Sequence, residues 1–206
     1  MKLYDGGRAP NPRRVTLFLA EKGVTVETVP VDMGAMEHKS EALSGLNPLQ
    51  RLPVLVLDDG TVLTETVAIC RYIEEIHPQP PLFGSTPLER AVVEMWQRRV
   101  EFHLFMPVAH AFRHLHPAMA SWEVPQVAEW GEANKPKAIE FLRLLDAELA
   151  GRPFVAGEHF TIADITAYVS VNFMKLARIP LPEDLPHVRR WHGEIAARPA
   201  IGAVGP

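Results

Sequence analysis

The sequence predicts an α/β half followed by an all-helical half. Up to residue 77, short runs rich in apolar and β-branched residues alternate with helical patterns, which is typical of an α/β domain. After Pro87 the apolar residues recur at helical spacing. The stretch between the halves, residues 78–87, contains four prolines and a glycine and is predicted to be a linker. The predicted domains are therefore residues 1–77 and 88–206.

The first domain is predicted to have a thioredoxin-like order of strands and helices. Its strongest local signal is a hairpin, because Asp59-Gly60 lies between two apolar runs and Gly accepts a positive φ without steric cost. Residues Ile69, Tyr72 and Ile73 then follow at helical spacing. The predicted elements, in chain order, are a strand at Lys2–Asp5, a helix from Pro12 to Gly23, a strand at 25–31, a polar connection at 32–48, a hairpin at 54–63 and a helix from Thr66 to about His77.

The two ends of this hairpin have the chemistry of a small binding site. Thr66 is a suitable N-cap for the following helix, whose first N–H groups and partial positive charge attract an anion. Glu65 can pair with a cation beside that anion, so a ligand with a carboxylate and an ammonium group on one carbon fits both. The Leu52-Pro53 bond can be cis, which would expose the backbone N–H and C=O of Leu52 to a peptide-like ligand.

These motifs, in this order and spacing, resemble the cytosolic glutathione transferase family over nearly the whole chain. The resemblance rests on Leu52-Pro53-Val54, on Glu65–Ile69 and on the distant segment Phe160–Ile165. It implies an N-terminal thioredoxin-like domain, a C-terminal helical bundle domain, and glutathione as co-substrate. By the same resemblance, the helices after Thr66 and Pro87 form the interface of a homodimer.

The resemblance also implies roles for the hairpin residues. Thr66 would hold the γ-glutamyl carboxylate, Glu65 the γ-glutamyl ammonium group, and the backbone of Leu52 before Pro53 the cysteinyl unit. The candidates for contact with the glycyl carboxylate are Gln50, Arg51, His38 and Lys39, which the sequence does not rank. The long helix after the linker would line a pocket for a small hydrophobic electrophile, with candidates Phe105, Met106, Phe112, Leu115 and Trp122.

The chain departs from the family where the glutathione sulfur is activated. Ala9 stands where a Ser or Cys is expected, and alanine has no hydrogen-bond donor. Asn11 could donate its amide to sulfur, as in a bacterial subgroup that this sequence resembles, and Tyr4 is a second candidate. The third is a face with His103 and His114, which could hold a water that takes the thiol proton. His110 belongs to the same set. His110 and His114 have the spacing of a metal-binding pair, but the sequence places no third ligand beside them, so no metal site is predicted.

The second domain carries its own helix signals. Thr161 and Asp164 have the spacing of a capping box, and the helix that follows is nearly apolar all round, as expected for a buried centre. Pro107 is predicted to kink the long helix, and Pro136 to break or bend a helix at 126–150.

Composition narrows the function classes. A net charge of −4 and the lack of a basic block argue against nucleic acid as a partner, and no apolar run is long enough to span a bilayer. Met1 leads directly into a predicted strand, so no signal peptide is expected. Cys70 is the single cysteine, which excludes an internal disulfide and favours a reducing cytoplasmic location.

Three functions follow. The first is a transferase, of the kind used in detoxification, that adds the glutathione thiolate to electrophilic hydrophobic substrates. The second is a glutathione-dependent reductase of disulfides or peroxides, which the loss of a donor at Ala9 leaves open. The third is a non-catalytic binding or scaffold module of the same fold, against which Glu65 and Thr66 argue because a scaffold needs no ligand pocket.

Overall fold

The computed structural model describes residues 1–204 and divides into two compact units. The first comprises Met1–Pro81 with the segment that begins at Pro199, and the second is Leu82–Arg198. The boundary thus falls inside the predicted linker at 78–87. The last segment differs from the predicted division, because α9 (Pro199–Val204) returns to the first unit and packs on α1 (Pro10–Lys22). Ile201 of α9 is buried there.

The first unit is built on a four-stranded mixed sheet. The strands are β1 (Lys2–Asp5), β2 (Glu27–Pro30), β3 (Val54–Val56) and β4 (Val62–Thr64), in the spatial order β2-β1-β3-β4. β1 and β2 are parallel and are joined through α1, whereas β1/β3 and β3/β4 are antiparallel. This is the predicted thioredoxin-like order, and the hairpin turn at Gly60 has the positive φ (86°) that its glycine permits.

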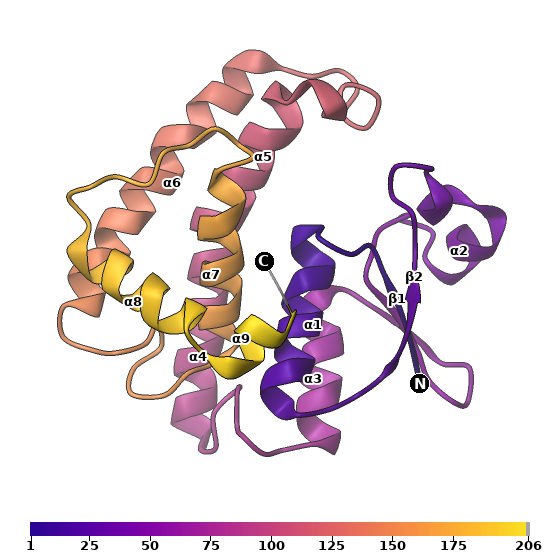
Figure 1. Ribbon diagram of the computed structural model, residues 1–206, viewed down its shortest axis with the longest axis horizontal. Helices are drawn as coiled ribbons and strands as arrows, with labels where there is room; N and C mark the ends of the chain where they lie inside the picture. The colour runs from indigo at the N-terminus through magenta and orange to yellow at the C-terminus, as the bar shows by residue number, and fades with distance from the viewer. Residues whose placement is uncertain (205–206) are drawn as a thin grey trace. The chain divides into compact units, whose positions relative to one another are not determined.

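Helices cover the sheet of the first unit. α1 and α3 (Thr66–Ile76) pack against each other, and α2 (Glu41–Leu46) lies on the other side of the strands (Figure 1). α1 ends at Gly23 in the left-handed conformation, as predicted from the sequence. The predicted polar connection also contains a 3₁₀ turn, η1 (Glu37–Lys39).

The second unit is all-helical and is organised around α7 (Ile162–Met174). Twelve of the thirteen residues of α7 are buried, and α4, α5 and α8 pack on it (Figure 1). Across residues 1–204, each helix is too short or too polar to traverse a lipid bilayer. The other elements of the unit are α4 (Pro87–Val100), the π-helical turn η2 (Glu101–Phe105), α5 (Met106–Leu115), the 3₁₀ turn η3 (Pro117–Met119), α6 (Ala128–Leu149) and α8 (Pro186–Ala196).

The two helix-internal prolines have different consequences. Pro107 is the second residue of α5, which begins directly after the π-helical turn η2, so the helix widens where the proline ring would crowd the preceding turn. Pro136, in contrast, does not break α6, which continues as one helix to Leu149. The face of α6 that carries Phe141 and Leu145 is buried, and this packing outweighs the one backbone hydrogen bond that the proline removes.

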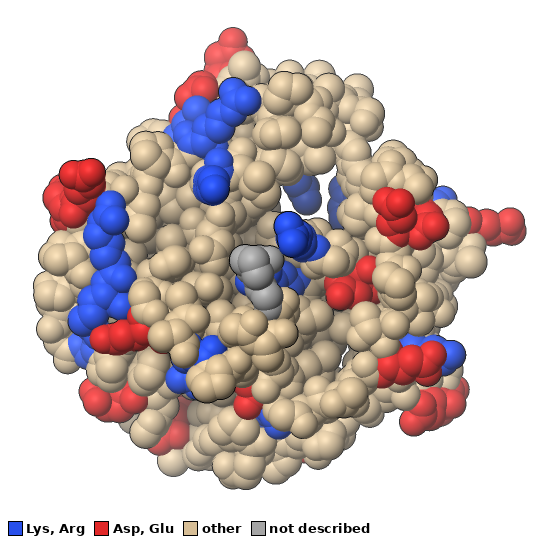
Figure 2. Space-filling view, viewed as in Figure 1, with Lys and Arg blue, Asp and Glu red and all other residues tan. Residues whose placement is uncertain are grey.

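The charged surface is mixed. On the face drawn in Figure 2, Lys and Arg side chains lie among Asp and Glu side chains. Salt bridges join some of these side chains, for example Arg143 and Asp184 at 2.7 Å.

Candidate functional site

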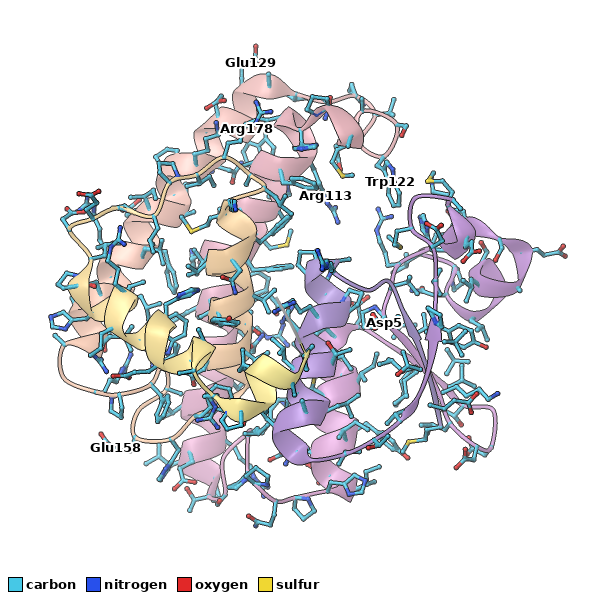
Figure 3. The ribbon with its side chains drawn as sticks, in the orientation of Figure 1. Asp5, Arg113, Trp122, Glu129, Glu158 and Arg178 are labelled. Carbon is cyan, nitrogen blue, oxygen red and sulfur yellow. The ribbon has the colours of Figure 1, made fainter. Side chains whose placement is uncertain are left out.

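Strand register brings the two ends of the hairpin to one edge of the sheet. Val54, the first residue of β3, pairs with Thr64, the last residue of β4. Leu52 and Pro53, which precede Val54, therefore lie across from the residues that follow Thr64. Val54 also pairs with Tyr4, so the carboxyl end of β1 reaches the same edge, where Figure 3 labels Asp5.

The Leu52-Pro53 bond is cis, as the sequence suggested. Leu52 lies outside the strand ladder, while its side chain packs in a small core with Val31 and Val54. Asn47, which is 3% exposed, donates its side-chain amide to the carbonyl of Arg51 at 2.8 Å. The side-chain packing and this hydrogen bond fix the loop, so the Leu52 peptide is held at the sheet edge.

The start of α3 has no side-chain cap, and Thr66 there is 6% exposed. The N-cap is Glu65 and not Thr66, which is the first helical residue, so the predicted cap is shifted by one position. Glu65 has φ 67° and ψ 120°, a conformation that costs a residue with a Cβ about 1–3 kcal/mol. Within residues 1–204, neither the Glu65 carboxylate nor the Thr66 hydroxyl forms a hydrogen bond or ion pair. The tip thus offers a hydroxyl, first-turn N–H groups and an adjacent carboxylate.

Gln50 closes the loop before the cis peptide. It also has a positive φ (52°), its backbone N–H donates to the carbonyl of Asn47 at 2.8 Å, and its side-chain Nε2 donates to Ser44 Oγ at 3.0 Å. The side chain is therefore tied to α2, which carries Ser44. His38 is only 1% exposed, and burial followed by the charges of nearby basic residues lowers its pKa.

The first turn of α1 faces the same sheet edge from the end of β1. Ala9 is its N-cap and supplies no side-chain hydrogen bond, and Pro10 and Pro12 have no N–H. Asn11, between the two prolines, is half-buried, and its Oδ1 accepts a hydrogen bond from Nη1 of Arg14 at 3.2 Å. Asn11 is thus the residue of this turn whose side chain carries a hydrogen-bond donor, the Nδ2 of its amide.

The histidines of the second unit share one face, as their spacing predicted, but that face packs on α6. His103 is exposed and stacks on Phe141 with ring centroids 6.0 Å apart. His110 meets Trp130 edge-on at 5.7 Å, and burial lowers its pKa.

His114 contributes to the start of α6. Its Nδ1 accepts a hydrogen bond from the backbone N–H of Val127, the N-cap of α6, at 3.0 Å. Its Nε2 lies 3.7 Å from Glu123 Oε1. An imidazole whose Nδ1 accepts in this way carries its proton on Nε2, so its lone pair is already used.

Comparison with known proteins identifies the family. The model for the glutathione S-transferase N-terminal domain matches residues 1–75, and the model for the C-terminal domain matches residues 128–194. Glutathione S-transferase 2 of Saccharomyces cerevisiae is 36% identical over 204 residues, which cover 98% of this chain and 88% of that protein. The chain belongs to the glutathione S-transferase family.

Solved glutathione S-transferase structures share the fold. The crystal structure of Gtt2 from Saccharomyces cerevisiae has a TM-score of 0.94 and 35% identity, covering 99% of this chain and all of that chain. A glutathione S-transferase domain-containing protein from Marinobacter aquaeolei VT8 has a TM-score of 0.92 and 40% identity, covering 98% of this chain and all of that chain. These comparisons confirm the predicted family and fold class.

As a glutathione S-transferase, this chain has no reactive thiol of its own near the sheet edge. Cys70 on α3 has no exposed surface, and burial raises the pKa of its thiol to about 12. At neutral pH it is therefore an inert core residue. Among residues 1–204, no cluster of three His, Cys, Asp or Glu side chains could hold a metal ion.

Proposed function

We propose that this chain conjugates glutathione to small electrophilic hydrophobic compounds. The observation that supports it best is the pairing of Val54 with Thr64, since a main-chain pairing site and an open helix tip then share one sheet edge. A γ-glutamyl tripeptide presents the matching groups, which are a zwitterionic end and a central peptide unit.

The tripeptide would be held by complementary groups. The Thr66 hydroxyl and the first N–H groups of α3 donate hydrogen bonds to the γ-glutamyl carboxylate. The Glu65 carboxylate pairs with the ammonium group on the same carbon. The backbone of Leu52 pairs with the cysteinyl unit in the manner of an added strand, and Gln50 contacts the glycyl end.

The chemistry requires a thiolate at neutral pH. A free thiol has a pKa of about 8.5, and a donor aimed at sulfur stabilises the charged form. In this proposal the Asn11 amide is that donor, and the thiol proton is released to solvent. The thiolate then attacks the electrophilic carbon, a C–S bond forms, and the leaving group departs with its electron pair.

The hydrophobic substrate would contact the helical domain. Phe112 of α5 lies in an aromatic cluster with Phe173, at 5.1 Å between ring centroids, and with His116, at 4.8 Å. Aromatic side chains of this kind provide the apolar wall that a hydrophobic electrophile needs.

Two measurements test the proposal. Glutathione affinity is measured by calorimetry, and thioether formation is followed with a model aryl halide. We expect saturable binding and halide release that depends on both substrates. A chain that binds glutathione but forms no thioether with any of a panel of aryl halides and activated alkenes contradicts the transferase assignment.

A reductase is the second candidate, but the comparisons do not favour it, because the named relatives are glutathione S-transferases. A bound glutathione could attack a mixed disulfide, which would release a thiol and leave glutathione disulfide. Comparing hydroxyethyl disulfide reduction with aryl halide conjugation separates the two reactions. Faster turnover of the disulfide would favour the reductase.

We further propose a homodimer. α4 exposes Leu88 (74%) and Met95 (40%), and Phe102 (58%) follows in η2, so the three lie seven residues apart on one stripe. An apolar stripe of this length is typical of an interface. Sedimentation analysis should show a dimer that Met95→Glu weakens, whereas Leu144→Glu, at an equally exposed apolar site on α6 (49%), leaves it intact.

A further inference from the structure

We propose that Arg14 is a positioning residue that fixes the orientation of the Asn11 side-chain amide, so that its NH₂ group points away from the core and toward the sulfur of bound glutathione. This inference deepens the proposed function and rests on it for the identity of the ligand. In this proposal Arg14 and Asn11 of α1 together replace the hydrogen-bond donor that is missing at Ala9.

The contact between the two side chains determines which way the amide points. A guanidinium group only donates hydrogen bonds, so the Asn11 atom 3.2 Å from Arg14 Nη1 is the acceptor Oδ1. The Nδ2 of Asn11, the other terminal atom of the amide, then points away from Arg14. A flip of the amide would place two donors against each other and lose this hydrogen bond.

Arg14 is able to hold this position because it is itself immobilised. Its side chain is 2% exposed, within an α1 that packs against both α3 and α9. On α3, the charges of Arg14 and Glu74 both act on the buried thiol of Cys70. α9 carries no titratable side chain. A buried guanidinium has little rotamer freedom, so the acceptor atom of Asn11 is held in place.

In the first turn of α1, the orientation of the Asn11 amide decides which donors face an anion. A normal helix start offers several N–H groups to an anion, but Pro10 and Pro12 remove two of them. Asn11 then provides the donors of this turn, through its backbone N–H and its amide. An amide turned by 180° would present its oxygen to the thiolate and destabilise it.

The first experiment measures the pKa of glutathione bound to the full chain, by ultraviolet difference absorbance of the thiolate. We expect Arg14→Met to raise this pKa by about one unit and to slow conjugation at low pH about tenfold, with little change at high pH. Arg14→Lys keeps a buried donor without an acceptor and should restore most of the shift. Unchanged pKa values in Arg14→Met would overturn the proposal.

A double-mutant cycle separates positioning from a direct effect of the Arg14 charge. If Arg14 acts through Asn11, Arg14→Met has no further effect on the thiol pKa in an Asn11→Ala background. An equal rise in both backgrounds means that the charge acts on sulfur directly, and the positioning role is then wrong.

A second experiment needs no glutathione. Nuclear magnetic resonance of the ligand-free chain should show one sharp pair of Asn11 amide signals in the wild type and in Arg14→Lys, and shifted or broadened signals in Arg14→Met. If glutathione binds to none of the variants, the proposed function fails, while these signals still decide whether Arg14 orients the amide. Identical, sharp signals in all three chains would refute the orientation.

Discussion

Two helix starts in this chain resemble each other in sequence and differ in structure. α7 begins after Thr161, whose backbone N–H and hydroxyl both donate to Asp164 Oδ2, at 2.9 Å and 3.1 Å. Asp164 has no exposed surface and accepts further hydrogen bonds from the Val155 N–H and from Trp191 Nε1, each at 2.9 Å. α3 also starts at a threonine, Thr66, but its tip has no side-chain cap.

The difference separates a structural use of a helix start from a binding use. Closing the tip of α7 satisfies donors that would otherwise be buried without partners, and it ties α7 to α8 through Trp191. Leaving the tip of α3 open keeps the same kind of donors available for an anion, while Glu65 adopts an unfavourable backbone conformation. The surrounding fold offsets that cost.

The largest expected effect is on the closed tip. Asp164→Ala removes the acceptor of the Val155, Thr161 and Trp191 N–H groups, each of which is then buried without a partner. We expect the free energy of unfolding to fall by about 3 kcal/mol or more, measured by urea denaturation. Glutathione affinity of the remaining folded protein should be unchanged. A loss below about 1 kcal/mol would show that the α7 cap is not a major source of stability.

The pH dependence of stability provides the next test of the closed tip. Burial raises the pKa of Asp164 from 3.8 to about 6, against the opposing effect of its hydrogen bonds. The folded chain therefore binds this proton more tightly than the unfolded chain. The contribution of Asp164 is complete below about pH 4 and falls by about 3 kcal/mol as the pH rises to about 6.

The measurement compares unfolding free energies of the wild type and Asp164→Asn between pH 4 and pH 7. Asn cannot ionise, so the difference between the two curves isolates the titration of this one carboxyl group. Parallel curves over the whole interval would mean that the pKa of Asp164 is not raised in the folded chain.

The open tip should respond in the opposite way. Thr66→Ala removes a hydroxyl that has no partner among residues 1–204, so stability should change by less than about 0.5 kcal/mol. Glutathione affinity should fall about tenfold or more, since a hydrogen bond to a charged group contributes about 1.5–3 kcal/mol. Thr66→Ser keeps the hydroxyl and serves as the matched control. Unchanged affinity in Thr66→Ala would remove this residue from the site.

Several features of these two regions could be predicted from local sequence signals. The turn at Asp59-Gly60, the cis bond at Leu52-Pro53 and the capping box at Thr161 each depend on residues close together in the chain. Local chemistry restricts the backbone strongly at such positions, so the pattern and the structure agree. The same reasoning identified the residues of the sheet edge.

The missed features depend on tertiary contacts. The shift of the α3 cap to Glu65 runs against the steric preference of a residue with a Cβ, so propensity favours Thr66. The contact of Arg14 with Asn11 requires knowing that Arg14 is buried, which its charge argues against. The return of α9 to α1 joins the two ends of the chain, which no local pattern encodes.

A smaller effect is expected at Glu65 itself. Glycine tolerates φ 67°, so Glu65→Gly relieves the backbone cost and should stabilise the fold by up to about 1 kcal/mol after the added freedom of the unfolded chain is subtracted. The same change removes the carboxylate and should weaken glutathione binding several-fold. Glu65→Ala is the control, because it loses the carboxylate but keeps the Cβ. Equal stability of the Gly and Ala variants would show that this backbone position is not strained.

The smallest effect concerns a third helix start, that of α6, which is capped from outside by His114. Loss of the bond from the Val127 N–H in His114→Ala should lower the free energy of unfolding by about 0.5–1 kcal/mol, measured by urea denaturation. His103→Ala removes only an exposed ring stacked on Phe141 and should lower the free energy of unfolding by less.

Both variants also test the sulfur chemistry. If Asn11 alone steadies the thiolate, the pH–rate profile of conjugation stays in place in both variants, because neither ring then takes part in the loss of the thiol proton. A displaced profile in His103→Ala or His114→Ala would assign that proton to the histidine face.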